Sequence, residues 1–158
     1  MATNDERVIE LMTRYFKYQL RELPKTPLDH WSYWGNRRGG DNLLMVYWLY
    51  NITRDNFLLE LSEILYKQTH PWKDHFEKGS LIDQNSFHCV NLAQGIKQPI
   101  IYYQQHSDRK YLNSVKKAFN DIKKYHGQPQ GMYGGDEHLH GNDPTKGVEF
   151  CSVTELMY

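Results

Sequence analysis

The chain has 158 residues, and its 19 Lys and Arg balance 19 Asp and Glu, so the formal charge at pH 7 is zero. Such a chain has no global field to attract nucleic acid or an anionic membrane. The longest apolar run, residues 43–50, is too short to cross a bilayer. Length and charge therefore argue against nucleic-acid and membrane partners, and they suit one domain or part of one.

The cysteine count and the N-terminal sequence bear on the cellular compartment. Cys89 and Cys151 are too few for a disulfide framework, so reduced thiols or a metal ligand are the simpler interpretations. The N-terminal stretch MATNDERVIELM lacks the basic start and apolar core of a secretory signal. The compartment stays open: cytoplasmic by default, periplasmic or secreted if a leader precedes this sequence.

The first predicted element is a helix over residues 5–22, where apolar side chains recur at helical spacing after a predicted N-cap at Asn4. Pro24 is expected to end it. Residues 26–42 are expected to form a loop. Its aromatic and cationic side chains are Trp31, Trp34, Arg37 and Arg38. This composition suits a sugar site, although packing against a neighbouring helix is the alternative for each Trp.

A second helix is predicted over residues 42–51, with Asp41 as its N-cap. It is apolar on nearly every side, which indicates burial all round. The third helix, residues 55–68, has a single apolar stripe and should lie on the outside. A connector containing Trp72 and Phe76 is expected to follow it.

Three further helices are predicted over residues 85–105, 108–125 and 148–158. The first of them carries His88 near its start and Pro99, which should kink it or mark a tight contact. The second is strongly amphipathic. Its predicted buried face consists of Tyr111, Leu112, Val115, Phe119 and Ile122.

The predicted helices alternate between outer, one-sided ones and inner, all-round apolar ones. A toroid of helical hairpins requires this alternation, so the expected fold is all-α, a partial (α/α)6 barrel of about three hairpins. An α-solenoid uses the same alternation and is the alternative. Solenoids usually show a fixed-period repeat, and we find none here.

This architecture predicts one shared pocket. Parallel inner helices place their N-terminal ends on one rim, and polar features precede or open each of them. These features are the loop with Arg38, the His88 helix start, the Gly-rich segment 131–151 and Glu149. We therefore expect Arg38, His88, Glu137 and Glu149 to face one concave side.

The Gly-rich segment 131–151 carries most of the acid, base and ligand chemistry of the chain. Its candidates are Asp136, Glu137, His138, His140, Asp143, Glu149 and Cys151. A polar, Gly-rich segment of this length favours a binding loop, with a surface loop as the alternative. A carboxylate and a thiol two residues apart, as in Glu149 and Cys151, can hold zinc from one turn, although most such pairs arise by chance.

The side chains within the segment have further candidate roles. Glu137 lies in a Gly-flanked turn, where a carboxylate can serve as a general acid or base. His138 and His140 have the spacing of metal ligands, but alternate histidines in a loop are more often surface or hydrogen-bonding side chains.

The runs GMYGGDEHLHGNDPTKGVEFCSVTELMY, HCVNLAQGIKQP and ERVIELMTRYFKYQL resemble the β-L-arabinofuranosidases of glycoside hydrolase family 127 and its relatives. The likeness extends over essentially the whole chain, and the loop that ends in Glu-x-Cys is its most specific part. The resemblance implies an (α/α)6 barrel that holds zinc with one Glu and three Cys. One of those cysteines is also the nucleophile of a retaining mechanism, and a second Glu is the acid/base.

The resemblance assigns roles to individual residues. Glu149 and Cys151 match two of the four zinc ligands, and Glu137 matches the acid/base. His88 matches a histidine that contacts the sugar, and Tyr133 is expected to contact it too. The substrate class that it implies is a plant-type glycan containing terminal β-L-arabinofuranose.

The sequence departs from the family in one respect. The family's adjacent cysteine pair, one member of which is the nucleophile, lies beyond the stretch that this sequence matches. Residues 1–158 are therefore expected to be an incomplete catalytic domain, inactive alone and prone to self-association through exposed barrel faces. The alternative is a non-catalytic helical module that binds carbohydrate or another partner.

Overall fold

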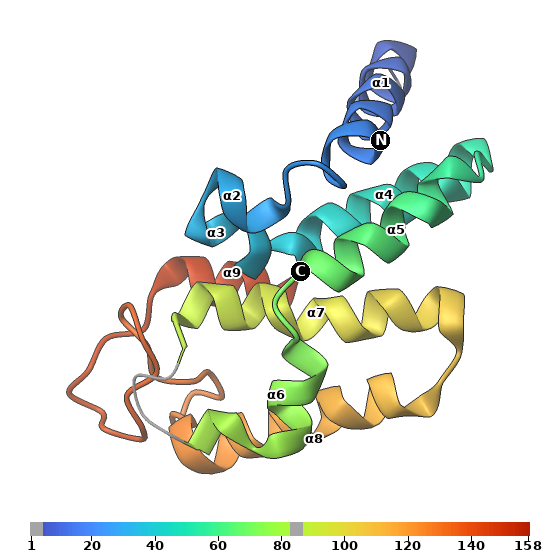
Figure 1. The fold of residues 1–158 in the computed structure, drawn as a ribbon. Coiled ribbons are helices and arrows are strands. Elements are labelled where there is room, and N and C mark those ends of the chain that lie inside the picture. Colours follow the sequence, from blue (N-terminus) through green and yellow to red (C-terminus); the bar gives the residue numbers. More distant parts are fainter. Residues whose placement is uncertain (1–4, 83–86) are drawn as a thin grey trace.

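The computed structural model describes residues 5–82 and 87–158, which are helical apart from loops and isolated bridges (Figure 1). The helices are α1 Glu6–Glu22, α2 Leu28–Trp31, α3 Tyr33–Arg37, α4 Gly39–Thr53, α5 Phe57–Gln68, α6 Trp72–Lys78, the 3₁₀ turn η1 Ser80–Ile82, α7 Cys89–His106, α8 Arg109–His126 and α9 Phe150–Met157. The all-α prediction is confirmed. Within the described ranges, no helix combines the length and apolar character that crossing a membrane requires.

Helix α7 lies at the centre of the molecule and contacts α4 on one side and α8 and α9 on others (Figure 1). Two apolar clusters meet along it. One gathers buried side chains of α1, α4 and α5 around the C-terminal half of α7. The other gathers α6, α8 and the loop after α8 around its N-terminal half. The hairpins α4–α5 and α7–α8 thus pack as expected for part of a helical toroid, with α4 and α7 as the inner helices.

Side-chain caps define several helix ends. The N-cap of α1 is Asp5, whose carboxylate accepts the Arg7 amide at 3.0 Å. The predicted cap, Asn4, lies outside the described residues. Asp108 caps α8 in the same way, through the Lys110 amide at 3.0 Å. Each cap satisfies an amide that the first turn of a helix leaves without a partner.

The prediction of a loop over residues 26–42 is wrong. Two short helices, α2 and α3, occupy it, and the Ser32 hydroxyl caps α3 by accepting the Gly35 amide at 3.0 Å. Helix α4 already begins at Gly39, so Asp41 lies inside its first turn rather than capping it. The Asp41 carboxylate instead binds Lys97 Nζ at 2.9 Å. Periodicity could not reveal α2 and α3 because neither is longer than five residues.

Three further boundary and burial predictions need correction. The stretch expected to be a connector after α5 forms α6, and its Trp72 and Phe76 are fully buried. Helix α7 begins at Cys89, with His88 as its N-cap, rather than at Asn85, which lies outside the described residues. Phe119 was expected inside but is 44% exposed.

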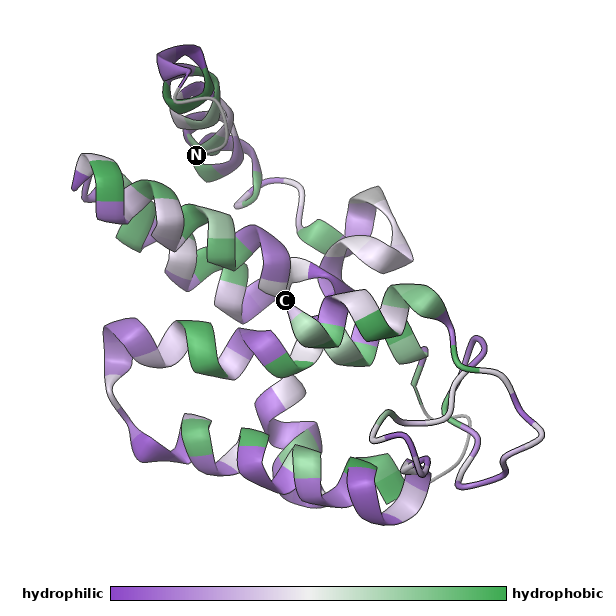
Figure 2. Ribbon diagram, turned by 180° about the vertical axis from the view of Figure 1, so that it is seen from behind, coloured by the Kyte–Doolittle hydropathy of each residue, from purple (hydrophilic) through white to green (hydrophobic). Residues whose placement is uncertain are grey.

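The buried face of α8 differs from the predicted one because small side chains occupy part of it. Ser114 and Ala118 lie in the interface with α7, beside Tyr111, Val115 and Ile122. Figure 2 shows the resulting alternation of apolar and polar residues along α8. Phe119 is left at the outer edge of this face, next to α9, where it lines two surface grooves.

Helix α9 is fastened to the inner helices by one lysine. Lys97 Nζ of α7 lies 2.5 Å from the Glu155 carboxylate of α9 and 2.9 Å from that of Asp41 in α4. The Lys97 side chain is only 12% exposed. Three helices that are distant in sequence therefore share one charged contact, which fixes α9 against α4 and α7 and positions the residues that precede α9.

Candidate active site

The N-terminus of α7 is built against the Gly-rich loop that follows α8. The Cys89 amide donates to the Glu137 carbonyl at 2.9 Å, and the Leu139 amide donates to the Phe87 carbonyl at 3.0 Å. His88 and His138 form the antiparallel bridge between these bonds. The two segments therefore lie side by side, and the loop places its acidic residues at the positive end of the α7 dipole.

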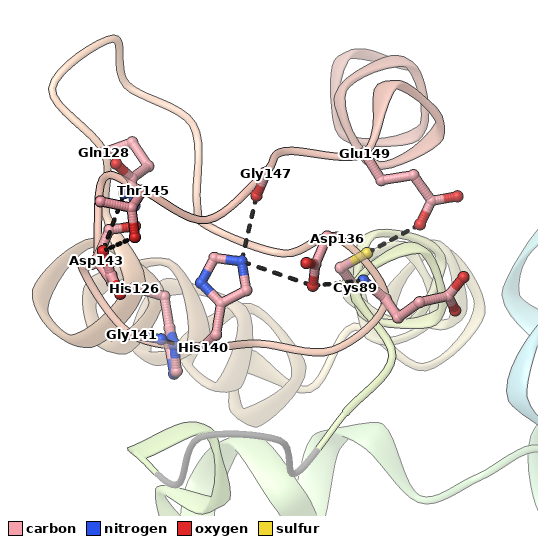
Figure 3. Close-up of polar contacts among 11 residues, drawn as sticks. Cys89, His126, Gln128, Asp136, His140, Gly141, Asp143, Thr145, Gly147 and Glu149 are labelled. Atoms are coloured by element: carbon pink, nitrogen blue, oxygen red, sulfur yellow. Dashed lines mark hydrogen bonds and ion pairs between the residues drawn. The ribbon is translucent and has the colours of Figure 1, made fainter.

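The loop over residues 127–149 is fixed by further backbone bonds. The Gly135 amide donates to the Gly147 carbonyl at 3.2 Å, and the Glu149 amide donates to the Gly135 carbonyl at 2.7 Å. His126, which is fully buried, accepts the Gly141 amide on Nδ1 at 3.0 Å. Figure 3 shows further polar contacts of the loop, among them that of His140 with Gly147. The loop is therefore held to the helices at several points, while residues 142–147 are exposed.

His88 binds the predicted acid/base. Its Nδ1 accepts the Val90 amide at 3.2 Å, so the neutral ring carries its proton on Nε2. That nitrogen lies 3.1 Å from Glu137 Oε2. The His88 side chain is 10% exposed and that of Glu137 is 73% exposed. A buried imidazole thus lies in contact with a carboxylate that stays open to solvent and can exchange a proton there.

Cys89 binds the second glutamate from the next position in the chain. Its thiol donates to Glu149 Oε2 at 3.2 Å (Figure 3). Cys89 is fully buried, and burial raises the pKa of its thiol to about 12, with the Glu149 carboxylate acting in the same direction. A Cβ on Gly135 would lie 2.6 Å from Cys89 Cβ, so only glycine allows the loop this close. Cys89 is therefore a protonated donor that positions Glu149.

The other residues assigned by resemblance occupy different surroundings. Cys151 is an exposed free thiol in the first turn of α9, and the Glu149 carboxylate raises the pKa of this thiol. Tyr133 is 1% exposed, and its hydroxyl donates to the Cys89 carbonyl at 2.7 Å. In this structure Tyr133 therefore supports the start of α7 through its hydroxyl and is almost fully buried.

Arg38 and Trp34 contact residues at the start of α7. Arg38 Nε donates to Asn91 Oδ1, one turn into α7, at 3.0 Å. The Trp34 ring lies 5.0 Å from the His88 ring, edge to face. Arg38, His88, Glu137 and Glu149 thus each belong to or contact the first residues of α7. The side chain of Trp31, the other tryptophan of this segment, lies outside the described residues.

The loop histidines do not act together. The His138 side chain is exposed, and its ring lies 6.0 Å from the His88 ring. His140 Nε2 lies 3.2 Å from the Gly147 carbonyl oxygen and 3.9 Å from Asp136 Oδ1. The two histidines therefore have different neighbours, and their i, i+2 spacing does not place them together as metal ligands.

The donor set for a metal is partial. Glu149 is the N-cap residue of α9 and Cys151 lies in its first turn, so a carboxylate and a thiol stand two residues apart at one helix start. Within the described ranges, no group of three or more His, Cys, Asp or Glu side chains is arranged to hold a metal ion. The residues present thus fit two positions of a tetrahedral zinc site.

Sequence reasoning missed the supporting residues of the site. Asn91 and Cys89 hold Arg38 and Glu149, and His126 holds the loop. The sequence indicates Cys89 and Asn91 only by their position, because both lie in the first turn of an inner helix directly after His88. The partners of Cys89 and Asn91 lie 60 and 53 positions away, and no local pattern specifies them.

In the comparison with protein families, the chain matches the catalytic domain of a class of glycoside hydrolases. The matching family model is described as "Beta-L-arabinofuranosidase, GH127 catalytic domain", it covers residues 1–158, and the chain belongs to this family. No curated protein and no solved structure matches the chain. The resemblance found from the sequence motifs is thereby confirmed.

Proposed function

We propose that this chain forms the part of a retaining β-L-arabinofuranosidase site that holds the terminal sugar and the acid/base, acting on plant-type glycans. The observation that carries the proposal is the 3.1 Å contact between His88 Nε2 and Glu137 Oε2 at the start of an inner helix. Glu137 would protonate the leaving oxygen and later deprotonate the attacking water. His88 would contact the sugar and keep Glu137 oriented.

The nucleophile is the part of this chemistry that the chain does not supply. Cys89 is buried and protonated, and Cys151 matches a zinc ligand of the family rather than the nucleophile. Loss of a nucleophile removes most of the rate enhancement of a covalent mechanism. The 158-residue chain should therefore bind β-L-arabinofuranosides without hydrolysing them.

The experiment is an NMR titration of the labelled chain with methyl β-L-arabinofuranoside, together with an assay of an aryl β-L-arabinofuranoside. We expect saturable shifts at His88 and Glu137, at least tenfold weaker binding in His88→Ala, retained binding in Glu137→Gln, and no turnover. Turnover that Glu137→Gln abolishes would place a nucleophile within this chain. Absence of binding would refute the substrate assignment and favour a non-catalytic module.

We also propose Glu149 and Cys151 as two ligands of a zinc ion, supported by their position two residues apart at the start of α9. Zinc would supply a Lewis acid that lowers the pKa of a bound thiol. Two protein ligands bind zinc weakly, so dialysed protein should retain much less than one equivalent. Metal analysis checks this. Stoichiometric zinc that Cys151→Ser removes would require further ligands from this chain, with His138 and His140 first in order.

A further inference from the structure

The pair Trp34 and Arg38, called here the Trp34–Arg38 shelf, lies at the rim of the candidate site. Trp34 belongs to α3, and Arg38 follows α3 directly. The Arg38 guanidinium carbon lies 4.8 Å from the Trp34 ring centroid, within the range of a cation–π contact. Trp34 is 41% exposed, and Arg38 is exposed as well. The shelf therefore presents an aromatic ring and a guanidinium to solvent.

The guanidinium is held in place from below. Arg38 Nε donates to Asn91 Oδ1 at 3.0 Å, and Asn91 is 2% exposed. A guanidinium has five N–H donors in a fixed plane, and this bond uses only the one on Nε. Fixing Nε and stacking the plane against Trp34 orders a side chain that is usually mobile. The Nη donors are thereby arranged before any ligand arrives, which lowers the entropic cost of binding.

The shelf is continuous with the residues proposed to hold the terminal sugar. The Trp34 ring is 5.0 Å from the His88 ring, and His88 in turn contacts Glu137. The His88 side chain is 10% exposed, so His88 lies deeper than Trp34. A second cation–aromatic pair, Arg54 over Tyr50, lies at the far end of α4. Unlike the Arg54–Tyr50 pair, the Trp34–Arg38 shelf lies next to the candidate site.

We propose that the Trp34–Arg38 shelf binds the sugar unit attached to the terminal arabinofuranose, on the leaving-group side. The aromatic ring would pack against the C–H face of that unit, and the Arg38 Nη donors would bind a pair of its hydroxyls. The inference rests on the proposed function, because it takes the deeper position beside His88 to be that of the terminal sugar. It makes Trp34 and Arg38 specificity-determining residues.

The test compares two ligands by NMR titration: methyl β-L-arabinofuranoside, and a disaccharide with the same terminal unit. Trp34→Ala and Arg38→Met should each weaken disaccharide binding about threefold to tenfold and change methyl glycoside binding less than twofold. Arg38→Lys keeps the charge without the planar fork and should fall between Arg38→Met and the unaltered chain. Arg54→Met is the matched control and should bind both ligands unchanged.

Each outcome decides between the two proposals. Equal weakening of both ligands, or no weakening of either, would overturn the shelf assignment and leave the proposed function standing. If the unaltered chain binds neither ligand, both proposals fail. Circular dichroism and thermal unfolding identify a variant that has lost its fold, and Trp34→Phe then replaces Trp34→Ala, with an intermediate loss of disaccharide affinity expected.

Discussion

His88 shows how one residue organises this site. Its backbone begins α7, its Nδ1 caps that helix, and its Nε2 orients Glu137. The side chain therefore has no freedom to change tautomer without losing one of these bonds. A substitution at His88 is expected to affect both the helix start and the carboxylate, and the Glu137→Gln variant separates these effects because it leaves the cap intact.

A second histidine makes stability depend on pH. His70 lies beside Arg37, and burial, together with the charge of Arg37, lowers the pKa of His70 to about 3. An unfolded chain binds a proton at His70 below about pH 6.5, while the folded chain does not until about pH 3. The contribution of His70 to stability is thus complete above about pH 6.5 and decreases as the pH falls through that window.

We expect His70→Asn to reduce the loss of unfolding free energy between pH 7.5 and pH 5, measured by urea titration. The site is half buried, so the difference should be at most about 1 kcal/mol after screening by water. His138→Asn, at an exposed histidine, is the control and should keep the slope of the unaltered protein. An unchanged slope in His70→Asn would mean that His70 is protonated in the folded chain.

At the scale of elements, α7 is the helix around which the others pack. It approaches α6 most closely at Gly95, which faces the ring of the fully buried Trp72. Pro99 is buried further along the same helix. The prediction that Pro99 marks a tight contact is consistent with its burial, and the helix continues to His106 beyond it. The length of α7 lets it serve both apolar clusters.

The Gly95–Trp72 contact predicts a large effect for a small substitution. In Gly95→Ala, the new Cβ would lie 2.3 Å from Trp72 Cδ2, so the ring or the helix must move. We expect a loss of about 1–3 kcal/mol in unfolding free energy, although alanine favours the helix by about 1 kcal/mol. Gly147→Ala, whose nearest contact would be 3.4 Å from Asp136 Cβ, is the control and should be close to neutral. Equal stability of the two variants would show that α6 and α7 are less tightly packed than described.

At the scale of the whole molecule, the described helices leave apolar surface uncovered around α9. Phe150, Met157 and Tyr158 are 76%, 82% and 77% exposed, and Ile100 and Phe119 line a groove of about 250 Å³ next to them. Exposed apolar patches of more than a few hundred Å² are rare on soluble monomers. The surface around α9 therefore favours association.

We predict that the chain self-associates through this surface at concentrations in the micromolar range or above. Sedimentation velocity should show species larger than the monomer, and Phe150→Ser combined with Met157→Lys should shift the distribution toward the monomer. An exposed charge substitution in α1, such as Lys17→Glu, should leave it unchanged, because α1 packs against α4 and α5. A compact monomer for the unaltered chain across that range would contradict the prediction.

The sequence by itself determined the long helices and their order, but not the short helices α2, α3 and α6. Residues 5–22, 55–68 and 108–125 repeat apolar side chains at helical spacing over several turns, and the structure ends these helices within two residues of the predicted bounds. A long helix can be predicted from its own sequence because the apolar residues of its buried face recur every three or four positions. The Glu-x-Cys loop likewise identified the family, which the comparison confirms.

Only the tertiary structure decided which side chains meet. The Cys89–Glu149 and Arg38–Asn91 contacts join residues 60 and 53 positions apart, and the burial of Tyr133 follows from a loop folding beneath α7. Such contacts depend on how α3, α7 and the Gly-rich loop pack. The two residues of each pair belong to separate segments, and neither sequence indicates that the segments meet. Local periodicity fixes which face of a helix is buried. Which residues of other segments contact that face is determined only by how the helices and loops pack.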